Sequence, residues 1–273
     1  MAVQTVDLSS AAPPVSAAPS PPGPGERVRS GASALDILRD EGTTAWGLID
    51  VARLRSTPIA DSLVAVVPFR RSLERAGIAP QRDFDHILLA VHPSLTLVEH
   101  HVDDARLEKF LDLAVGESDE PASRATIGGH ACAKLRNKNG RGTACALAPG
   151  LLLITNNTHL DLWDRLAAAD IPSPSSDEAA HFAVLDERIF HYLGFPNSLG
   201  AGEMSAIVRP DNSLRIDGRF KSEHPSIDQK TLVEKLPIPG VKVHMQQGEV
   251  SLFLEVTPED ADALVAVLKV VGG

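Results

Sequence analysis

One short segment of the sequence mixes carboxylates with imidazoles. Residues 99–104 read EHHVDD, and imidazole together with carboxylate is a ligand set that first-row transition metals accept. On a strand, however, successive side chains point to opposite faces, so Glu99 and His101 would lie on one face and His100 on the other. The two aspartates that follow suit the first turn of a helix, where a carboxylate caps backbone amides and meets the positive end of the helix dipole. We therefore predict no metal site here.

Two aspartates occupy matching places in the two halves of the sequence. Asp50 ends the apolar run 46–50 and Asp186 ends the run 182–186, and a helical stretch follows each run. Two carboxylates can perform general acid–base chemistry when they meet across a cleft. An aspartate between a strand and a helix ordinarily serves as a cap or turn residue. We expect the two carboxylates to lie far apart, each bonded to nearby backbone amides, and we assign no catalytic residue.

Two other segments could bind anions, and both are interpreted as structural. Residues 194–202 are glycine-rich, but they precede a strand, whereas a phosphate-binding loop connects a strand to a following helix and, in a P-loop, carries a lysine. The sequence also has no GxSxG elbow from which serine hydrolysis could start. A hairpin tip carries the basic residues Lys134, Arg136, Lys138 and Arg141. We interpret this tip as a solvated hairpin end, with an anionic partner as the alternative.

The two cysteines flank this hairpin. Cys132 and Cys145 stand on either side of the turn at 137–140, which contains Asn-Gly, a strong hairpin signal. Folding about that turn places the cysteines nearly opposite each other, at a separation close to what a disulfide requires. Their spacing does not match a zinc site. A structural disulfide and a pair of reduced core cysteines both remain open, and a disulfide would favour an oxidising compartment.

Apolar periodicity predicts the elements that position these residues. Besides the cysteine hairpin, strands are expected at 45–49, 86–91, 95–102, 151–155, 182–185, 204–208, 214–220, 241–244 and 250–256. Helices are expected at 34–38, 57–77, 103–114, 158–166, 187–193, 226–236 and from 257 onward, with Pro68 interrupting the second and Gly77 ending it. Residues 116–124 are expected to be a charged loop.

The order of these elements recurs after residue 176. Each half reads strand, helix, two strands, helix, two or three strands, helix. Hairpins outnumber helical crossovers, so the predicted fold class is α+β: two tandem repeats of mostly antiparallel sheet with helices packed on one face.

The predicted domain organisation has three parts. Residues 1–33 form a Pro/Ala/Ser-rich linker that cannot bury enough apolar surface to order itself. Residues 34–170 form the first repeat and 177–273 the second, separated by the loop 171–176. No signal peptide is visible. Either the start lies upstream and carries an anchor, which suggests the cell envelope or periplasm, or residues 1–33 are a disordered tail of a cytoplasmic protein.

Composition narrows the classes of partner. The formal net charge of −10 argues against nucleic acid and anionic membrane surfaces, which attract clustered lysine and arginine. Aromatic residues make up 4% of the chain, which is poor material for stacking on bases or sugars. No stretch reaches the roughly 20 apolar residues that span a bilayer. The partner therefore stays unknown, with a protein or cell-envelope partner as the expectation.

The sequence from residue 45 onward resembles uncharacterised two-repeat proteins of myxobacterial-type, high-GC bacteria, many of them predicted lipoproteins. The similarity rests on WGLIDVARLRS at 46–56, on DFDHILLA at 83–90 and on APGLLLI at 148–154. The 18 arginines against 8 lysines fit such a genome. The resemblance implies an envelope location and brings no activity, so no site residue is transferred.

The sequence thus predicts a binding or structural module of the cell envelope without catalytic, cofactor or metal residues. The alternatives are an enzyme whose site is assembled from dispersed residues between the repeats, and a cytoplasmic protein of another role.

Overall fold

The computed structural model describes residues 30–57, 60, 69–116, 123–137, 140–156, 159–186, 199–222, 240–246 and 248–257. Most of the predicted linker and the predicted helices at 187–193, at 226–236 and from 258 onward lie outside these residues. So do most of the first half of the predicted helix 57–77 and Thr158, the first residue of the predicted helix 158–166.

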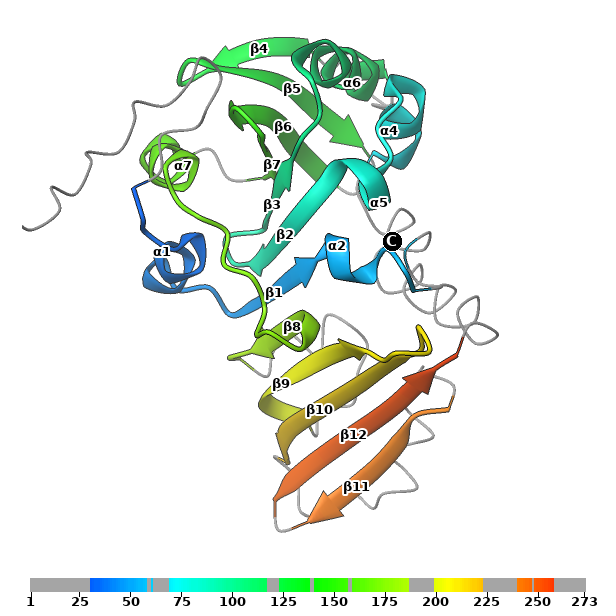
Figure 1. Cartoon of the computed structure of the whole chain (residues 1–273). Coiled ribbons are helices and arrows are strands. Elements are labelled where there is room, and N and C mark those ends of the chain that lie inside the picture. The colour runs from blue at the N-terminus through cyan, green and yellow to red at the C-terminus, as the bar shows by residue number, and fades with distance from the viewer. Residues whose placement is uncertain are drawn as a thin grey trace, which may run out of the picture.

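The described strands form one antiparallel sheet (Figure 1). They are β1 (Ala45–Asp50), β2 (Phe84–Val91), β3 (Leu95–His100), β4 (Ser123–Ile127), β5 (His130–Asn137), β6 (Gly140–Ala148), β7 (Leu151–Thr155), β8 (Glu178–Val184), β9 (Leu199–Val208), β10 (Leu214–Ser222), β11 (Lys242–Gln246) and β12 (Glu249–Val256). Their order across the 12-stranded sheet is β11-β12-β10-β9-β8-β1-β2-β3-β7-β6-β5-β4. The α+β class is therefore confirmed, and strands from both predicted repeats share a single sheet.

The antiparallel pair β1–β8 joins the two halves of this sheet. Leu48 lies opposite His181, and Gly47 lies opposite Phe182. A Cβ atom at position 47 would come within 2.4 Å of the Phe182 ring. Glycine at this position therefore lets Phe182 lie directly across the central strand.

Six described helices surround the half of the sheet that contains β1 to β7. They are α1 (Ala34–Asp40), α2 (Val51–Leu54), α4 (Arg70–Ala76), α5 (Pro80–Asp83), α6 (Asp104–Gly116) and α7 (Leu160–Ala167). The predicted stop of α4 at Gly77 is confirmed, because this residue has a φ of 79° and its N–H bonds the last turn of the helix. The N-cap position of α7 is His159.

These helices cover both faces of the sheet, so the prediction of helices on one face is wrong. One core joins α2, α4 and α6 to the sheet face that carries Ile87 and Val98. The other core joins α1 and α7, which contact each other, to the face that carries Leu88 and Leu97. The physical reason is visible in β1, whose six residues are all buried, so each of its faces needs an apolar cover.

Three strand boundaries also differ from the prediction. Ser123–Ile127 forms β4 at the edge of the sheet, within and beyond the expected charged loop. β8 begins at Glu178, and β9 begins at Leu199, inside the glycine-rich segment. All three segments are poor in large apolar residues, so apolar periodicity cannot mark them as strands.

Candidate functional site

A single row of directly opposed residues crosses all twelve strands and shows how the sheet changes along its width. From β4 to β11 the row reads Ala125, Cys132, Cys145, Leu153, Leu97, Leu88, Leu48, His181, Ser205, Asp217, Phe253 and Lys242. Directly opposed residues in an antiparallel sheet point to the same face. This face is therefore apolar up to β1 and turns polar at β8.

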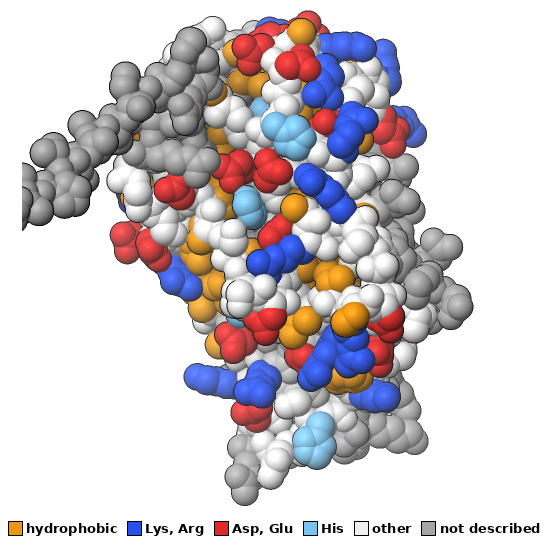
Figure 2. Space-filling view, viewed as in Figure 1, with side chains coloured by type: hydrophobic (Ala, Val, Ile, Leu, Met, Phe, Trp, Pro, Cys, Tyr) orange, Lys and Arg blue, Asp and Glu red, His pale blue; other side chains and the backbone are white. Residues whose placement is uncertain are grey.

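The other face of the same sheet stays apolar across the same strands. Its neighbouring row passes from Val98, Ile87 and Ile49 to Ala180, Ala206, Ile216 and Leu254. Polarity on β8 to β12 is therefore confined to one face, which we call the open face. It carries the side chains that share the face of His181 and Ser205. Figure 2 shows charged side chains gathered over the region where Figure 1 draws β9 to β12.

A cavity of about 370 Å³ lies on the open face. Its lining is polar except for a few residues and comprises Glu178, His181, Glu203, Ser205, Arg215, Asp217, Gly218, Arg219, Ser251, Leu252 and Phe253. A pocket that holds a small molecule typically measures about 300–1,000 Å³, so this one suits a small ligand.

Arg215 and His181 in this cavity already have carboxylate partners. Arg215 Nε lies 2.7 Å from Asp217 Oδ2, and the Arg215 guanidinium stacks over the Phe253 ring at 5.4 Å. The hydrogen bond to Asp217 raises the pKa of Arg215. His181 Nδ1 lies 3.1 Å from Glu178 Oε2. These contacts fix the side chains that border the cavity.

Arg219 differs from these residues. It lies directly opposite Glu203 in the sheet, yet among the described residues no carboxylate is within ion-pair distance of Arg219. Glu203 instead approaches His181 Nε2 at 3.7 Å. Among the described residues, the cavity therefore presents a cation without an ion-pair partner and a carboxylate from the adjacent strand.

A second polar group lies where β1 and β3 end and β2 begins. His86 is opposite Asp50 on one side and Glu99 on the other. Its Nδ1 lies 3.0 Å from Glu99 Oε2, and its Nε2 lies 3.0 Å from the hydroxyl of Ser173, which belongs to the segment between α7 and β8.

The predicted acidic–histidine segment spans the end of β3, which contains Glu99 and His100, and His101 lies beyond the strand. Glu99 pairs with His86, and His101 Nδ1 lies 3.4 Å from Asp85 Oδ2. His100 is buried, its Nδ1 accepts a hydrogen bond from the Val102 amide, and burial lowers its pKa to about 4. No group of three or more residues with metal-ligand side chains converges anywhere in the described part of the chain.

The aspartates at the start of α6 and at the end of β1 act as caps. Asp103 accepts a hydrogen bond from the Arg106 amide at 2.9 Å, and Asp50 accepts one from the Arg53 amide at 3.1 Å. Asp50 also pairs with the Arg53 side chain at 3.0 Å.

Asp50 and Asp186 do not form a pair. Ala45 lies opposite Val184, whereas Ile49 lies opposite Ala180. The two aspartates are therefore at opposite ends of the β1–β8 pair, roughly 20 Å apart at about 3.4 Å per residue. The amide of Asp186 bonds the Thr44 carbonyl at 3.2 Å.

The two predicted anion-binding segments are only partly described. Within the glycine-rich segment, Leu199 to Gly202 belong to β9. The basic hairpin tip places Arg136 opposite Arg141 and Lys134 opposite Thr143, and Lys138 lies outside the described residues. Lys134 is exposed.

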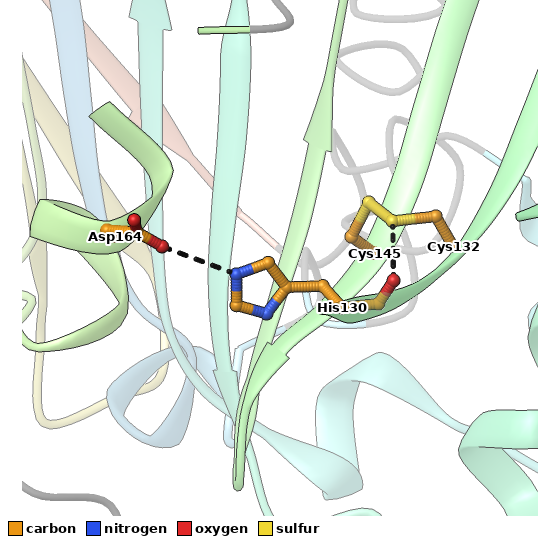
Figure 3. Close-up of a disulfide and its surroundings, with 4 residues drawn as sticks. All are labelled: His130, Cys132, Cys145 and Asp164. Carbon is orange, nitrogen blue, oxygen red and sulfur yellow. Dashed lines mark hydrogen bonds and ion pairs between the residues drawn. A yellow bond between two sulfur atoms is a disulfide. The ribbon is translucent and has the colours of Figure 1, made fainter. Parts of the chain in front are cut away.

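Cys132 and Cys145 lie directly opposite each other on β5 and β6, as predicted, and a disulfide joins them. Their Cα atoms are 4.1 Å apart. Both residues are fully buried in the core that includes Trp163 of α7. Figure 3 shows that His130, which lies on β5 with Cys132, points toward Asp164 of α7. The distance from His130 Nε2 to Asp164 Oδ1 is 3.7 Å.

Asp83 is a buried carboxylate that the sequence analysis missed. It accepts hydrogen bonds from the Ala79 amide and from the side chains of Arg82 and Arg106. Burial raises its pKa, but the hydrogen bonds from Arg82, Ala79 and Arg106 outweigh this and lower the pKa to about 2. The group fastens α6 to α5, so its role is structural. Local sequence gives no signal for it, because Arg106 is 23 residues away.

Solved structures of similar fold include TP0453, a membrane-associated lipoprotein of Treponema, in two crystal forms. Form I matches with a TM-score of 0.52 at 10% identity over 84% of this chain and 93% of TP0453. Form III matches with a TM-score of 0.53 at 11% identity over 84% and 94%. At such identities the likeness shows the fold alone. No protein-family model and no curated protein matches the sequence.

The predicted resemblance is thus shown only as a similarity of fold to TP0453, and the sequence family that it named is not shown. In the described part of the chain, no helix combines the length and the apolar character that crossing a membrane requires.

Proposed function

We propose that this protein is a binding module of the cell envelope and that its ligand occupies the cavity on the open face. The observation that carries the proposal is the change from apolar to polar residues along one face of a continuous sheet. The N-terminal half of that face packs under α1 and α7. The C-terminal half presents a cavity with converging charged and hydroxyl groups. Such convergence in a concave site is typical of ligand recognition.

The charges in the cavity indicate the class of ligand. Glu178, Glu203 and Asp217 oppose Arg215 and Arg219, so a purely anionic ligand would meet more negative than positive charge. A small zwitterion fits better: its acidic group pairs with Arg219 and its amino group with Glu203. The hydroxyls of Ser205 and Ser251 provide further hydrogen bonds.

Two observations support the envelope location. The fold resembles that of TP0453, and the cysteine pair forms a disulfide. Structural disulfides persist mainly in oxidising compartments. Fractionation of cells that express the native gene, with thiols trapped by alkylation at lysis, tests the location. Recovery in the envelope fraction with both cysteines oxidised supports it, and recovery in the cytoplasm with reduced thiols contradicts it.

We further propose that residues 34–170 and 177–273 descend from a duplicated unit. Outward from the central pair, the strands run β1, β2, β3, β7 on one side and β8, β9, β10, β12 on the other. A duplication explains this mirrored order.

The ligand proposal is tested by screening free amino acids and other small zwitterions for a rise in melting temperature, followed by calorimetry on each hit. Arg219→Ala should abolish binding of the hits. Arg209→Ala is the matched control, because Arg209 pairs with Glu255 outside the cavity lining. If Arg219→Ala binds the hits as tightly as wild type, the cavity is not the site.

A further inference from the structure

The arrangement of Ser173, His86 and Glu99 indicates a chemical activity in addition to ligand binding. The serine oxygen and the glutamate carboxylate contact the two different nitrogens of one imidazole, each at 3.0 Å. A hydroxyl, an imidazole and a carboxylate in this order form the relay by which serine hydrolases activate their nucleophile.

The hydrogen bonds fix the direction of proton transfer. The Glu99 carboxylate can only accept, so Nδ1 of His86 carries the proton and Nε2 is left as the acceptor that faces the Ser173 hydroxyl. The hydrogen bond to Glu99 raises the pKa of His86, burial opposes this, and the charges of Glu99, Asp50 and Asp85 add to the rise. These carboxylates stabilise the imidazolium that forms when the serine loses its proton.

The backbone holds Ser173 in a fixed and accessible position. Prolines flank it on both sides, and each restricts the local backbone. Ile171 and Pro174 are buried while Ser173 is exposed. Beyond them, Nη1 of Arg53 donates to the carbonyl oxygens of Ser175 and Glu178 at 2.9 and 2.8 Å. Positioning of this kind lowers the entropy cost of bringing a nucleophile to its substrate.

We propose that Ser173 is a nucleophile, activated by His86 and oriented through Glu99, that accepts acyl groups from small esters. In the acylation step Ser173 Oγ bonds to the carbonyl carbon and its proton passes to His86 Nε2. The carbon–oxygen bond to the alcohol then breaks, and the alcohol leaves with that proton. Water, activated by the same imidazole, attacks the acyl-serine and releases the carboxylic acid.

Pro174 limits the range of substrates. In many hydrolases the amide of the residue after the nucleophile stabilises the oxyanion, and a proline has no amide hydrogen to give. Loss of one such donor lowers the rate by about 10²–10³-fold. The site should therefore react with activated esters and leave amides intact.

The experiment compares labelling and acyl transfer in a small set of variants of the folded, disulfide-bonded protein. A fluorophosphonate probe followed by peptide mass mapping should label Ser173. p-Nitrophenyl acetate should give a burst of about one nitrophenolate per chain. Ser173→Ala and His86→Asn should each lower labelling and burst rate at least tenfold. Ser176→Ala, an exposed serine of the same segment, should leave both unchanged.

A pH profile separates activation from a merely structural hydrogen bond. The burst rate should rise with pH as His86 loses its proton. Glu99→Gln should lower the rate and move the midpoint to lower pH, because it removes the main interaction that raises the His86 pKa. The other groups that face His86, namely Asp50 with its partner Arg53, and Asp85, stay in place.

Ser173 is exposed, so the Ser173→Ala protein keeps the proposal testable even if a histidine or glutamate variant fails to fold. Absence of label from Ser173 in the folded wild type, or an equal burst in Ser173→Ala, would overturn the proposal. Neither result bears on the zwitterion site, because Arg219 and Glu203 take no part in this relay.

Discussion

The two halves of one sheet face show how residue type decides between core and site. In β1, β2 and β3 the row of opposed residues is leucine, and α1 and α7 cover it. In β8, β9 and β10 the continuation of the row is His181, Ser205 and Asp217, and these border a cavity. One continuous sheet face is therefore part of the apolar core on one side of the β1–β8 pair and a surface with polar and charged side chains on the other.

Trp46 marks the boundary between these two parts. Its ring stacks on His181 at 5.3 Å with the planes 19° apart, and Arg39 of α1 lies over it at 5.1 Å. The covered part thus ends on an aromatic ring that contacts the first polar residue of the open face.

The largest difference between the halves is expected in stability. Leu97→Ala should lower the free energy of unfolding by about 3 kcal/mol, because Leu97 is fully buried and the cavity left behind collapses only in part. Ser205→Ala, further along the same row, should change it by less than about 0.5 kcal/mol. Urea denaturation of both variants measures the contrast. Equal effects would mean that the open face is packed like a core.

The disulfide lies in the covered half and should stabilise the fold without affecting the open face. The double variant Cys132→Ala with Cys145→Ala should lower the free energy of unfolding by about 3 kcal/mol, since the bond closes a loop of 13 residues in the unfolded chain. Ligand affinity at the open face should stay unchanged in this variant at temperatures where it remains folded. A variant as stable as wild type would show that the bond adds nothing to the fold.

Removing the charge of a carboxylate that pairs with arginine should also lower the free energy of unfolding by different amounts in the two halves. Asp83→Asn should lower the free energy of unfolding by about 2 kcal/mol, because the Asp83 side chain is only 4% exposed and forms ion pairs with Arg82 and Arg106. Asp217→Asn removes a comparable contact to Arg215 from a side chain that is 33% exposed, and it should cost less than about 1 kcal/mol. Thermal and urea unfolding of the two variants test this order, and a reversed order would contradict it.

Acid should destabilise the covered half through His100. The pKa of His100 is about 4 in the folded protein and about 6.5 in the unfolded chain. The unfolded chain therefore binds the proton more tightly, and the contribution of neutral His100 to the free energy of unfolding is full above pH 6.5 and is lost as the pH falls toward 4. Between pH 7.5 and pH 5 this amounts to about 2 kcal/mol. His86, whose pKa is raised, contributes with the opposite sign and loses its contribution as the pH rises. His100→Gln should flatten the fall in stability on the acid side, and His244→Gln, exposed on the open face, should not.

Much of this organisation follows from local sequence. The Asn-Gly turn places Cys132 opposite Cys145. Antiparallel pairing of the predicted neighbouring strands 86–91 and 95–102 places His86 opposite Glu99. Apolar residues at helical spacing locate α6. In each case the determining interactions lie within about 20 residues of one another.

Other features depend on contacts that no local pattern encodes. Ser173 reaches His86 across 87 residues, and the β1–β8 pairing joins segments more than 130 residues apart. The sheet face on which α1 and α7 pack depends on which strand surfaces remain uncovered after the sheet forms. The open face was missed because its alternation of polar and apolar residues is also that of an ordinary solvated sheet.

Two single cysteine variants test directly whether this sheet face is covered up to β8 and open beyond it. Ala183→Cys and Ser205→Cys place thiols on the same face of adjacent strands, one within the core and one in the cavity lining. In the folded, disulfide-bonded protein a charged methanethiosulfonate should modify Ser205→Cys at least 100-fold faster than Ala183→Cys. Equal protection of both thiols would show that another part of the chain covers the open face, so that the face is not divided at β8.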